Sequence, residues 1–316
     1  MRAVGLTSFD GPDVLHLVDV PLPEPADGEV RIKVAAATVN PSDAAFRAGA
    51  FGPPAHGDGP PYVAGWELAG VVDAVGSGSG SGRAGAQVGD RVFAIVFPYA
   101  TGRGAQAEYV VVSGDSVALV PHGVCLAEAA TLPMNGLSAR LALDTLGLRP
   151  GQTLAVTGAA GAVGGYVMQL AGAEGLRVIG DASPADVDLV KSLGADVVVE
   201  RGPDVAAAIR RQVPEGVDAV VDAALIGPPV LAAIRDGGQL IAVRPFAGAS
   251  ERSITITPVF VLDYVHESAK LAELARLAGE GTLTLRVASE IPAAEAALVH
   301  RQLEAGGTRG RLVLTF

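Results

Sequence analysis

The stretch Leu154–Ala171, LAVTGAAGAVGGYVMQLA, decides the fold of this chain. A short β-type run, Thr153–Val156, leads into a glycine turn, and apolar residues then recur at helical spacing. A second β-type run, Leu176–Gly180, completes a β-α-β unit. Strands and helices continue to alternate as far as Gln239–Val243, so the sequence predicts an α/β fold with a doubly wound parallel sheet.

The glycine turn resembles a dinucleotide-binding fingerprint. From Ala159 the chain reads A-A-G-A-V-G, a variant of G-x-G-x-x-G with alanine in first place. Gly161 would let the backbone approach a diphosphate, Gly164 would let the helix pack closely on the strand, and the helix N-terminus attracts negative charge. Glycine turns also serve plain strand–helix packing, so the β-α-β context is what favours nucleotide binding. The expected contacts are Thr157, Ala160, Gly161, Ala162, Val163 and Gly164.

Composition limits the classes of function. The 316 residues are 49% hydrophobic and 18% charged, with a formal net charge of −11. This length suffices for two domains, and the acidic balance argues against a nucleic-acid-binding surface. Cys125 is the single cysteine, so we expect neither an intrachain disulfide nor a thiolate zinc cluster. We expect a cytoplasmic protein without a secretion signal or a membrane span.

A change of pattern divides the chain into two domains. The first third is β-rich and punctuated by proline and glycine, whereas strands and helices alternate after Pro121. The last β segment, Arg311–Thr315, is expected to rejoin the N-terminal β region. The sequence therefore predicts a discontinuous β-rich domain, residues 1–123 and 264–316, and an inserted dinucleotide-binding domain, residues 124–263. Gly76–Gly85 reads as a flexible loop within the β-rich part.

Short motifs in a fixed order extend the pattern along nearly the whole chain. They are Asn40–Asp43 (NPSD) with Arg47–Gly49, Gly65–Val72 (GWELAGVV), Gly89–Val92 (GDRV), Gly104–Tyr109 (GAQAEY), Glu128–Ala130, Val156–Gly164, Gly194–Asp196, Gly216–Asp218, Gly237–Gly238 and Thr308–Leu314 (TRGRLVL). Together they resemble the medium-chain dehydrogenase/reductase superfamily, and within it the zinc-free quinone oxidoreductases similar to zeta-crystallin. The resemblance implies a GroES-like β-rich catalytic domain and a doubly wound Rossmann cofactor domain.

The resemblance also bears on the chemistry. In the zinc alcohol dehydrogenases of this superfamily, cysteine, histidine and cysteine bind the catalytic metal at positions that align with Asn40, Trp66 and Met134. Asparagine, tryptophan and methionine offer no comparable ligand set. The resemblance therefore implies hydride transfer from a dihydronicotinamide to a quinone or an α,β-unsaturated carbonyl compound, without zinc.

Three residues are candidates for the catalytic, substrate-binding side. Asn40 could hold a substrate carbonyl or a bridging water, or could instead cap the N-P-S-D turn. Phe51 stands where many relatives carry a tyrosine, so it would supply an apolar wall but no proton. Tyr62 could replace the lost hydroxyl, as could Tyr99 or Tyr264.

The residues after the predicted strands bear on the choice of cofactor. By resemblance, the place of a ribose-binding acid falls near Ala182, which favours NADP(H). Asp181 and Asp186 would repel a phosphate, and Arg201 or Arg244 could compensate. We expect NADPH, with NADH possible. Further cofactor contacts are expected at Thr131, Asn135, Asp181, Ala182, Ser183, Asp222, Ala223, Val243 and Arg244.

Two other functions remain open. One is an enoyl reductase dedicated to a secondary-metabolite intermediate of polyketide type, because the glycine-rich loop Phe51–Pro61 leaves room for an unusual substrate. The other is a non-catalytic dinucleotide-binding sensor, which an intact phosphate turn does not exclude. The expected partners are a small-molecule substrate and, by resemblance, a second copy of the chain paired through an edge strand at Ser253–Val261.

Overall fold

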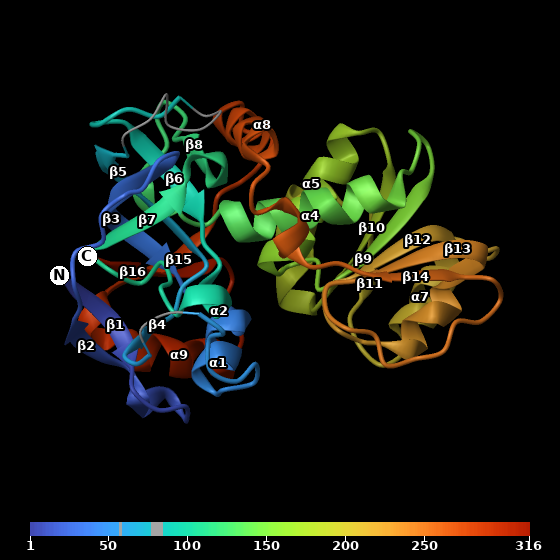
Figure 1. Cartoon of the computed structure of the whole chain (residues 1–316). Helices are drawn as coiled ribbons and strands as arrows, with labels where there is room; N and C mark the ends of the chain where they lie inside the picture. Colours follow the sequence, from blue (N-terminus) through green and yellow to red (C-terminus); the bar gives the residue numbers. More distant parts are fainter. Residues whose placement is uncertain (57–58, 77–84) are drawn as a thin grey trace. The chain divides into compact units, whose positions relative to one another are not determined.

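The computed structural model describes residues 1–56, 59–76 and 85–316, which form two compact units (Figure 1). Unit 1 comprises Met1–Met134, Val265–Glu280 and Leu285–Phe316, and unit 2 comprises Asn135–Tyr264 and Gly281–Thr284. Residues 77–84, which make up most of the predicted flexible loop Gly76–Gly85, lie outside the described residues, as do residues 57–58. The domain limits of residues 123/124 and 263/264 stay predictions.

Unit 2 contains a parallel sheet with the strand order β11-β10-β9-β12-β13-β14 among the described residues. The predicted doubly wound parallel sheet is therefore confirmed. The predicted edge strand is also present, because β14 pairs only with β13 in this order. The strands are β9 (Thr153–Thr157), β10 (Arg177–Ala182), β11 (Val197–Glu200), β12 (Val217–Asp222), β13 (Ile234–Ala242) and β14 (Thr255–Pro258).

Helices cover both faces of this sheet, with α5 and α7 on opposite sides (Figure 1). Buried residues of α7, among them Val205 and Ile209, pack in one core cluster with Ala155 of β9 and Val220 of β12. The segment between β12 and β13 contains a 3-10 helix, Pro228–Ala233. The α-helices are α4 (Pro133–Leu146), which begins in unit 1, α5 (Ala162–Ala173), α6 (Val187–Ser192) and α7 (Val205–Gln212).

Unit 1 is built mainly from antiparallel strands. The long strand β3 lies between β16 and β5 in one sheet, and β2-β1-β4 forms another. Pairing of β16 with β3 confirms that the C-terminal segment rejoins the N-terminal β region. The strands are β1 (Arg2–Leu6), β2 (His16–Asp19), β3 (Glu29–Thr38), β4 (Tyr62–Val63), β5 (Glu67–Val75), β6 (Arg91–Ile95), β7 (Tyr109–Ser113), β8 (Val117–Leu119), β15 (Val287–Pro292) and β16 (Arg311–Thr315).

Three helices of unit 1, α1 (Pro41–Arg47), α2 (Pro98–Thr101) and α9 (Ala296–Ala305), were not foreseen. The N-P-S-D segment starts the helix α1 rather than a simple turn, because Pro41 fits the first helical turn and the Asp43 carboxylate accepts the Asn40 N–H at 2.7 Å. Unit 1 also contains α3 (Leu126–Ala129) and α8 (Ser268–Gly279). Among the described residues, no helix has both the length and the apolar character needed to cross a membrane.

A buried cationic contact joins α1 to α9. Arg47 donates to the Asp10 carbonyl at 3.0 Å and to the Glu304 carboxylate at 2.6 Å. Its Nη1 lies 3.4 Å from Nδ1 of His300, which is fully buried. Burial, and then the charge of Arg47, lowers the pKa of His300 to about 3 from 6.5. His300 is therefore neutral in the folded protein.

We predict that neutral His300 makes stability fall in acid. The stability it contributes is present above about pH 6.5 and is lost as the pH falls towards 3. Each pKa unit corresponds to about 1.4 kcal/mol, so about 2–3 kcal/mol is lost by about pH 4.5. Urea unfolding of wild type and His300→Gln at about pH 7.5 and 4.5 should show the gap between them narrowing or reversing in acid. A constant gap would contradict the neutral imidazole.

We also predict opposite effects for two glycines of α5. A Cβ at Gly164 would lie 2.4 Å from the Gly158 carbonyl oxygen, whereas one at Gly172 has only the Gly194 carbonyl oxygen, at 4.0 Å. Gly164→Ala should therefore cost about 3 kcal/mol through overpacking, and Gly172→Ala should be neutral or stabilising by up to about 1 kcal/mol. Chemical denaturation of both variants checks this, and equal stabilities would contradict it.

Candidate functional site

The glycine turn follows the carboxyl end of β9, which is an inner strand of the unit 2 sheet. Gly158 has a φ of +67°, a left-handed conformation that favours glycine. A Cβ on Gly158 would lie 3.0 Å from the Ala223 carbonyl carbon, and one on Gly161 would lie 2.9 Å from the Gly158 carbonyl oxygen. The tight turn therefore starts at Gly158, one residue before the alanine that heads the A-A-G-A-V-G alignment.

A hydrogen bond between two buried side chains, Thr157 of β9 and Asp222 of β12, connects this turn to the neighbouring strand. The Thr157 hydroxyl donates to Asp222 Oδ1 at 2.6 Å. The Asp222 carboxylate also accepts the N–H groups of Ile226 at 3.1 Å and Gly227 at 2.9 Å. Asp222 thus fixes the loop that begins at Ala223, which keeps the ends of β9 and β12 together.

Other residues at this edge of the sheet are more exposed. Val243 is half-buried and Arg244 is exposed, directly after β13. Leu225, in the loop after β12, has a φ of +59° and is 48% exposed. A leucine in the left-handed region is strained, and such strain is concentrated at functional sites. Sequence reasoning missed this residue, because the torsion angle leaves no mark in the residue type.

On the other side of β9, the end of β10 carries an acid with several partners. The Asp181 carboxylate accepts the Ala159 N–H at 3.0 Å and pairs with the Arg201 Nε at 3.1 Å. Ala182 is buried and follows it in the strand. The Ser183 hydroxyl donates to Asp186 at 2.6 Å. Predicted cofactor residues from β9, β10 and β12 therefore form one hydrogen-bonded edge.

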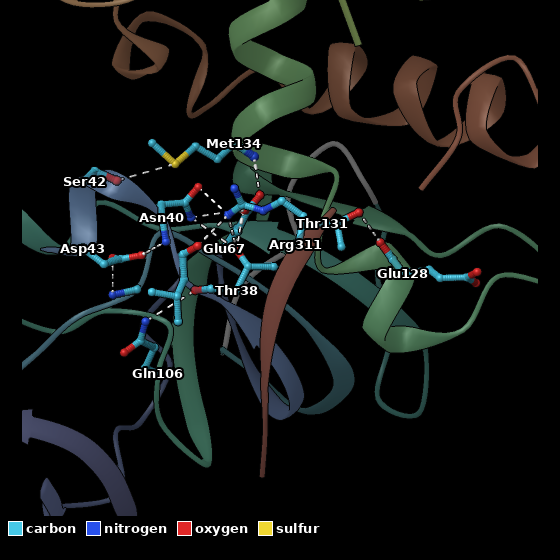
Figure 2. Close-up of polar contacts among 12 residues, drawn as sticks. Thr38, Asn40, Ser42, Asp43, Glu67, Gln106, Glu128, Thr131, Met134 and Arg311 are labelled. Atoms are coloured by element: carbon cyan, nitrogen blue, oxygen red, sulfur yellow. Dashed lines mark hydrogen bonds and ion pairs between the residues drawn. The ribbon is translucent and has the colours of Figure 1, made fainter. Parts of the chain in front are cut away.

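Unit 1 contains a second polar cluster, around Asn40 (Figure 2). Arg311 Nη2 donates to the Asn40 amide oxygen at 2.5 Å and lies 3.1 Å from Glu67 Oε1. The Asn40 amide nitrogen lies 3.2 Å from both the Thr38 hydroxyl and Glu67 Oε1, and the Thr38 hydroxyl donates to the same carboxylate. These four side chains are buried. The charge of Glu67 is therefore balanced inside the sheet.

Strand order explains why these residues meet. Thr38 ends β3, Glu67 begins β5, Arg311 begins β16, and β3 lies between the other two strands. Sequence reasoning quoted Glu67 and Arg311 only as parts of motifs. Each charged residue stands at the start of a strand and is followed by a run of apolar residues, and the two are opposite in sign, which is the signal that could have paired them.

Asp43 lies next to this cluster. It is fully buried, and its carboxylate accepts the N–H groups of Asn40 at 2.7 Å and Gly65 at 2.9 Å. Burial raises the pKa of Asp43 to about 7, although the two backbone donors oppose the shift. Asp43 thus connects the start of α1 to the segment before β5.

The first turn of α4 is anchored to the same cluster (Figure 2). The Met134 N–H donates to Glu67 Oε2 at 2.7 Å, and the Ser42 hydroxyl lies 3.9 Å from the Met134 sulfur. Thr131, just before this helix, donates to the Glu128 carbonyl at 2.8 Å. Asn135 is buried in the same first turn. Thr131 and Asn135, both predicted to contact the cofactor, therefore lie just before and just after the backbone N–H of Met134 that Glu67 binds.

The remaining substrate-side candidates belong to aromatic contacts of unit 1. The Phe51 ring is 62% exposed and lies 4.3 Å from the Tyr99 ring. Tyr62 stacks on Phe9 at a ring distance of 5.6 Å. Trp66 is buried and packs edge-on against Tyr99. Among the described residues, no hydrogen bond, ion pair or ring contact joins Phe51 or Tyr62 to Asn40.

Comparison with known proteins shows to which family the chain belongs. Residues 26–122 match the family model described as alcohol dehydrogenase GroES-like domain, and residues 193–314 match the one described as zinc-binding dehydrogenase. A quinone oxidoreductase of Pongo abelii is 30% identical over 99% of this chain and 97% of its own length. A 2-methylene-furan-3-one reductase of Solanum lycopersicum is 34% identical over 76% of this chain, but the match spans only 61% of that relative.

A solved structure has the same fold as this chain over its full length. A mycobacterial protein complexed with NADPH is 30% identical, covers 100% of both chains and has a TM-score of 0.85. The full-length matches and the two family models agree with the arrangement of strands in both units. The chain therefore belongs to the medium-chain dehydrogenase/reductase superfamily, and within it to the family of the quinone oxidoreductases.

Proposed function

We propose that this protein transfers hydride from NADPH to a quinone or an α,β-unsaturated carbonyl compound. The observation that carries the proposal is the turn after β9, where Gly158 has a φ of +67° and a Cβ at Gly161 or Gly164 would lie 2.9 or 2.4 Å from the Gly158 carbonyl oxygen. In open α/β sheets, nucleotides bind outside the carboxyl ends of the strands. The relatives act as quinone and enone reductases by name, and one is complexed with NADPH.

The residues of unit 2 fit the nucleotide. The backbone of residues 160–163, at the start of α5, would hold the diphosphate, because the positive end of the helix dipole attracts a phosphate there. Thr157, Asp222 and Ala223 would keep the neighbouring loop in place. Ala182 and Ser183, which follow Asp181 at the end of β10, would lie towards the adenosine ribose. When bound, NADPH supplies a hydride from its dihydronicotinamide ring.

On the substrate side we propose Asn40, Phe51 and Tyr62. The amide of Asn40 already bonds to Arg311, Thr38 and Glu67, so its role is to position the end of β3 and hold the cluster together. Phe51 offers an exposed apolar ring to a planar acceptor. With Phe51 lacking a hydroxyl, Tyr62 or water donates the proton that completes the reduction.

We propose that the reaction needs no zinc. The side chains at the aligned metal positions are those of Asn40, Trp66 and Met134, and Glu67 behind them is balanced by Arg311. Within residues 1–56, 59–76 and 85–316, no three His, Cys, Asp or Glu side chains are grouped so that they could hold a metal ion. Charge on the reduced acceptor must then be stabilised by hydrogen bonds rather than by a Lewis acid.

We further propose a homodimer that pairs through β14. In the sheet order of the described residues β14 is an edge strand that pairs with β13 alone, and Phe260 and Leu262 after it are exposed. Light scattering at micromolar concentration should give a mass near twice the 31.8 kDa of the chain. A mass equal to that of one chain would rule this dimer out.

Enzyme activity is the direct test of the proposed function. Purified protein should oxidise NADPH in the presence of 9,10-phenanthrenequinone or a simple enone, with a turnover of roughly 1 s⁻¹ or more. Dialysis against a chelator should leave the rate unchanged. The folded Gly172→Ala variant serves as a control for general perturbation of α5.

Three results would contradict the proposal in different ways. Nucleotide binding without turnover on a broad panel of acceptors would favour the sensor. Turnover of one thioester-linked enoyl substrate alone would favour a dedicated enoyl reductase. Activity that a chelator abolishes and zinc restores would contradict the metal-free mechanism.

A further inference from the structure

The acid at the end of β10 does not have the surroundings of a ribose-binding acid. In Rossmann sheets that prefer NAD, a carboxylate near the end of the second strand accepts hydrogen bonds from the ribose hydroxyls. Asp181 occupies nearly that place but is only 2% exposed. One of its oxygens accepts the Ala159 N–H at 3.0 Å, and the other lies 3.1 Å from the Arg201 Nε. Its hydrogen-bonding capacity is directed into the protein.

Arg201 reaches this acid from the neighbouring strand. It follows β11 directly, and its own N–H donates to the Ala182 carbonyl at 2.8 Å, which fixes its backbone beside the end of β10. Its side chain is 36% exposed. Nε and Nη2 face Asp181, at 3.1 and 3.5 Å, while Nη1 has no partner among the described residues. One edge of the guanidinium is therefore held and the other is available.

A held guanidinium is suited to a phosphate. Arginine presents several N–H donors in a rigid fork, so one carboxylate can orient it while another anion binds the remaining donors. The ion pair also neutralises Asp181, which would otherwise repel a phosphate at this point. The pair thus changes the end of β10 from a site for ribose hydroxyls into one that accepts negative charge.

A second acid, Asp186, limits the preference for a phosphorylated ribose. Asp186 is buried and accepts the Ser183 hydroxyl at 2.6 Å. Its charge opposes a phosphate that binds near Ser183, and that hydroxyl is already committed. The preference for a phosphorylated ribose should therefore be moderate, about ten- to a hundredfold in Kd.

We propose that Arg201, oriented by Asp181, is the residue that selects NADPH by binding its 2′-phosphate. This inference rests on the proposed function, because it requires the nucleotide to bind along the carboxyl edge of the unit 2 sheet. Asp181 acts as a positioning residue for the guanidinium and makes no contact with the ribose. Arg244, after β13, lies three strands from β10 in the sheet order and takes no part.

Dissociation constants for NADPH and NADH, measured by calorimetry without any acceptor, test the proposal. Wild type should bind NADPH about ten- to a hundredfold more tightly than NADH, and the difference should shrink as salt increases. Arg201→Gln should lose most of this preference by weakening NADPH alone. Because that variant leaves Asp181 buried without its cation, the double variant Asp181→Asn/Arg201→Gln is the better folded comparison. It should bind both nucleotides with the affinity that wild type has for NADH.

Arg244→Gln tests the other candidate arginine on this edge of the sheet, and Arg211→Gln, at an exposed position of α7, is the matched control for loss of an arginine. Both variants should keep the wild-type preference. The proposal is overturned if the double variant still prefers NADPH while it binds NADH normally, or if Arg244→Gln loses the preference instead. Failure of wild type to bind either nucleotide would instead remove the proposed function on which the inference rests.

Discussion

The close approach of α5 to the turn after β9 is the constraint on which unit 2 depends. At Gly164 the helix passes so near the Gly158 carbonyl that no side chain fits between them. This contact sets where α5 begins, and hence where the N–H groups of its first turn point. Thr157, Asp181 and Asp222 then bind the same turn to the ends of β10 and β12. The nucleotide site that we propose on this edge would therefore be a consequence of packing.

In unit 1, a buried ion pair is the corresponding constraint on the structure. Glu67 is buried between three strands and the first turn of α4, and Arg311 is its counter-ion. Breaking such a pair by removing one partner is costly, because it leaves a buried charge without compensation. In the metal-free reaction that we propose, the guanidinium of Arg311 rather than a metal ion balances the charge of Glu67.

The sequence predicted the elements with strong periodicity and missed features that depend on distant residues. The β-α-β unit around the glycine turn and the return of Arg311–Thr315 to β3 followed from pattern. The helix α1 was missed, because its capping residues also suit a turn. The Glu67–Arg311 pair was also missed, because it joins residues far apart in sequence that only strand order brings together. Arg201 was named as one of two arginines that could compensate for Asp181, and the structure pairs it with that acid. The roles of the individual site residues stay predictions.

The central claim is that the backbone around residues 160–163 binds the diphosphate of a pyridine nucleotide. A crystal structure of the protein with NADPH tests it most directly. The account predicts diphosphate density within hydrogen-bonding distance of these N–H groups, at the start of α5. Nucleotide bound elsewhere, with this turn left to solvent, would contradict it.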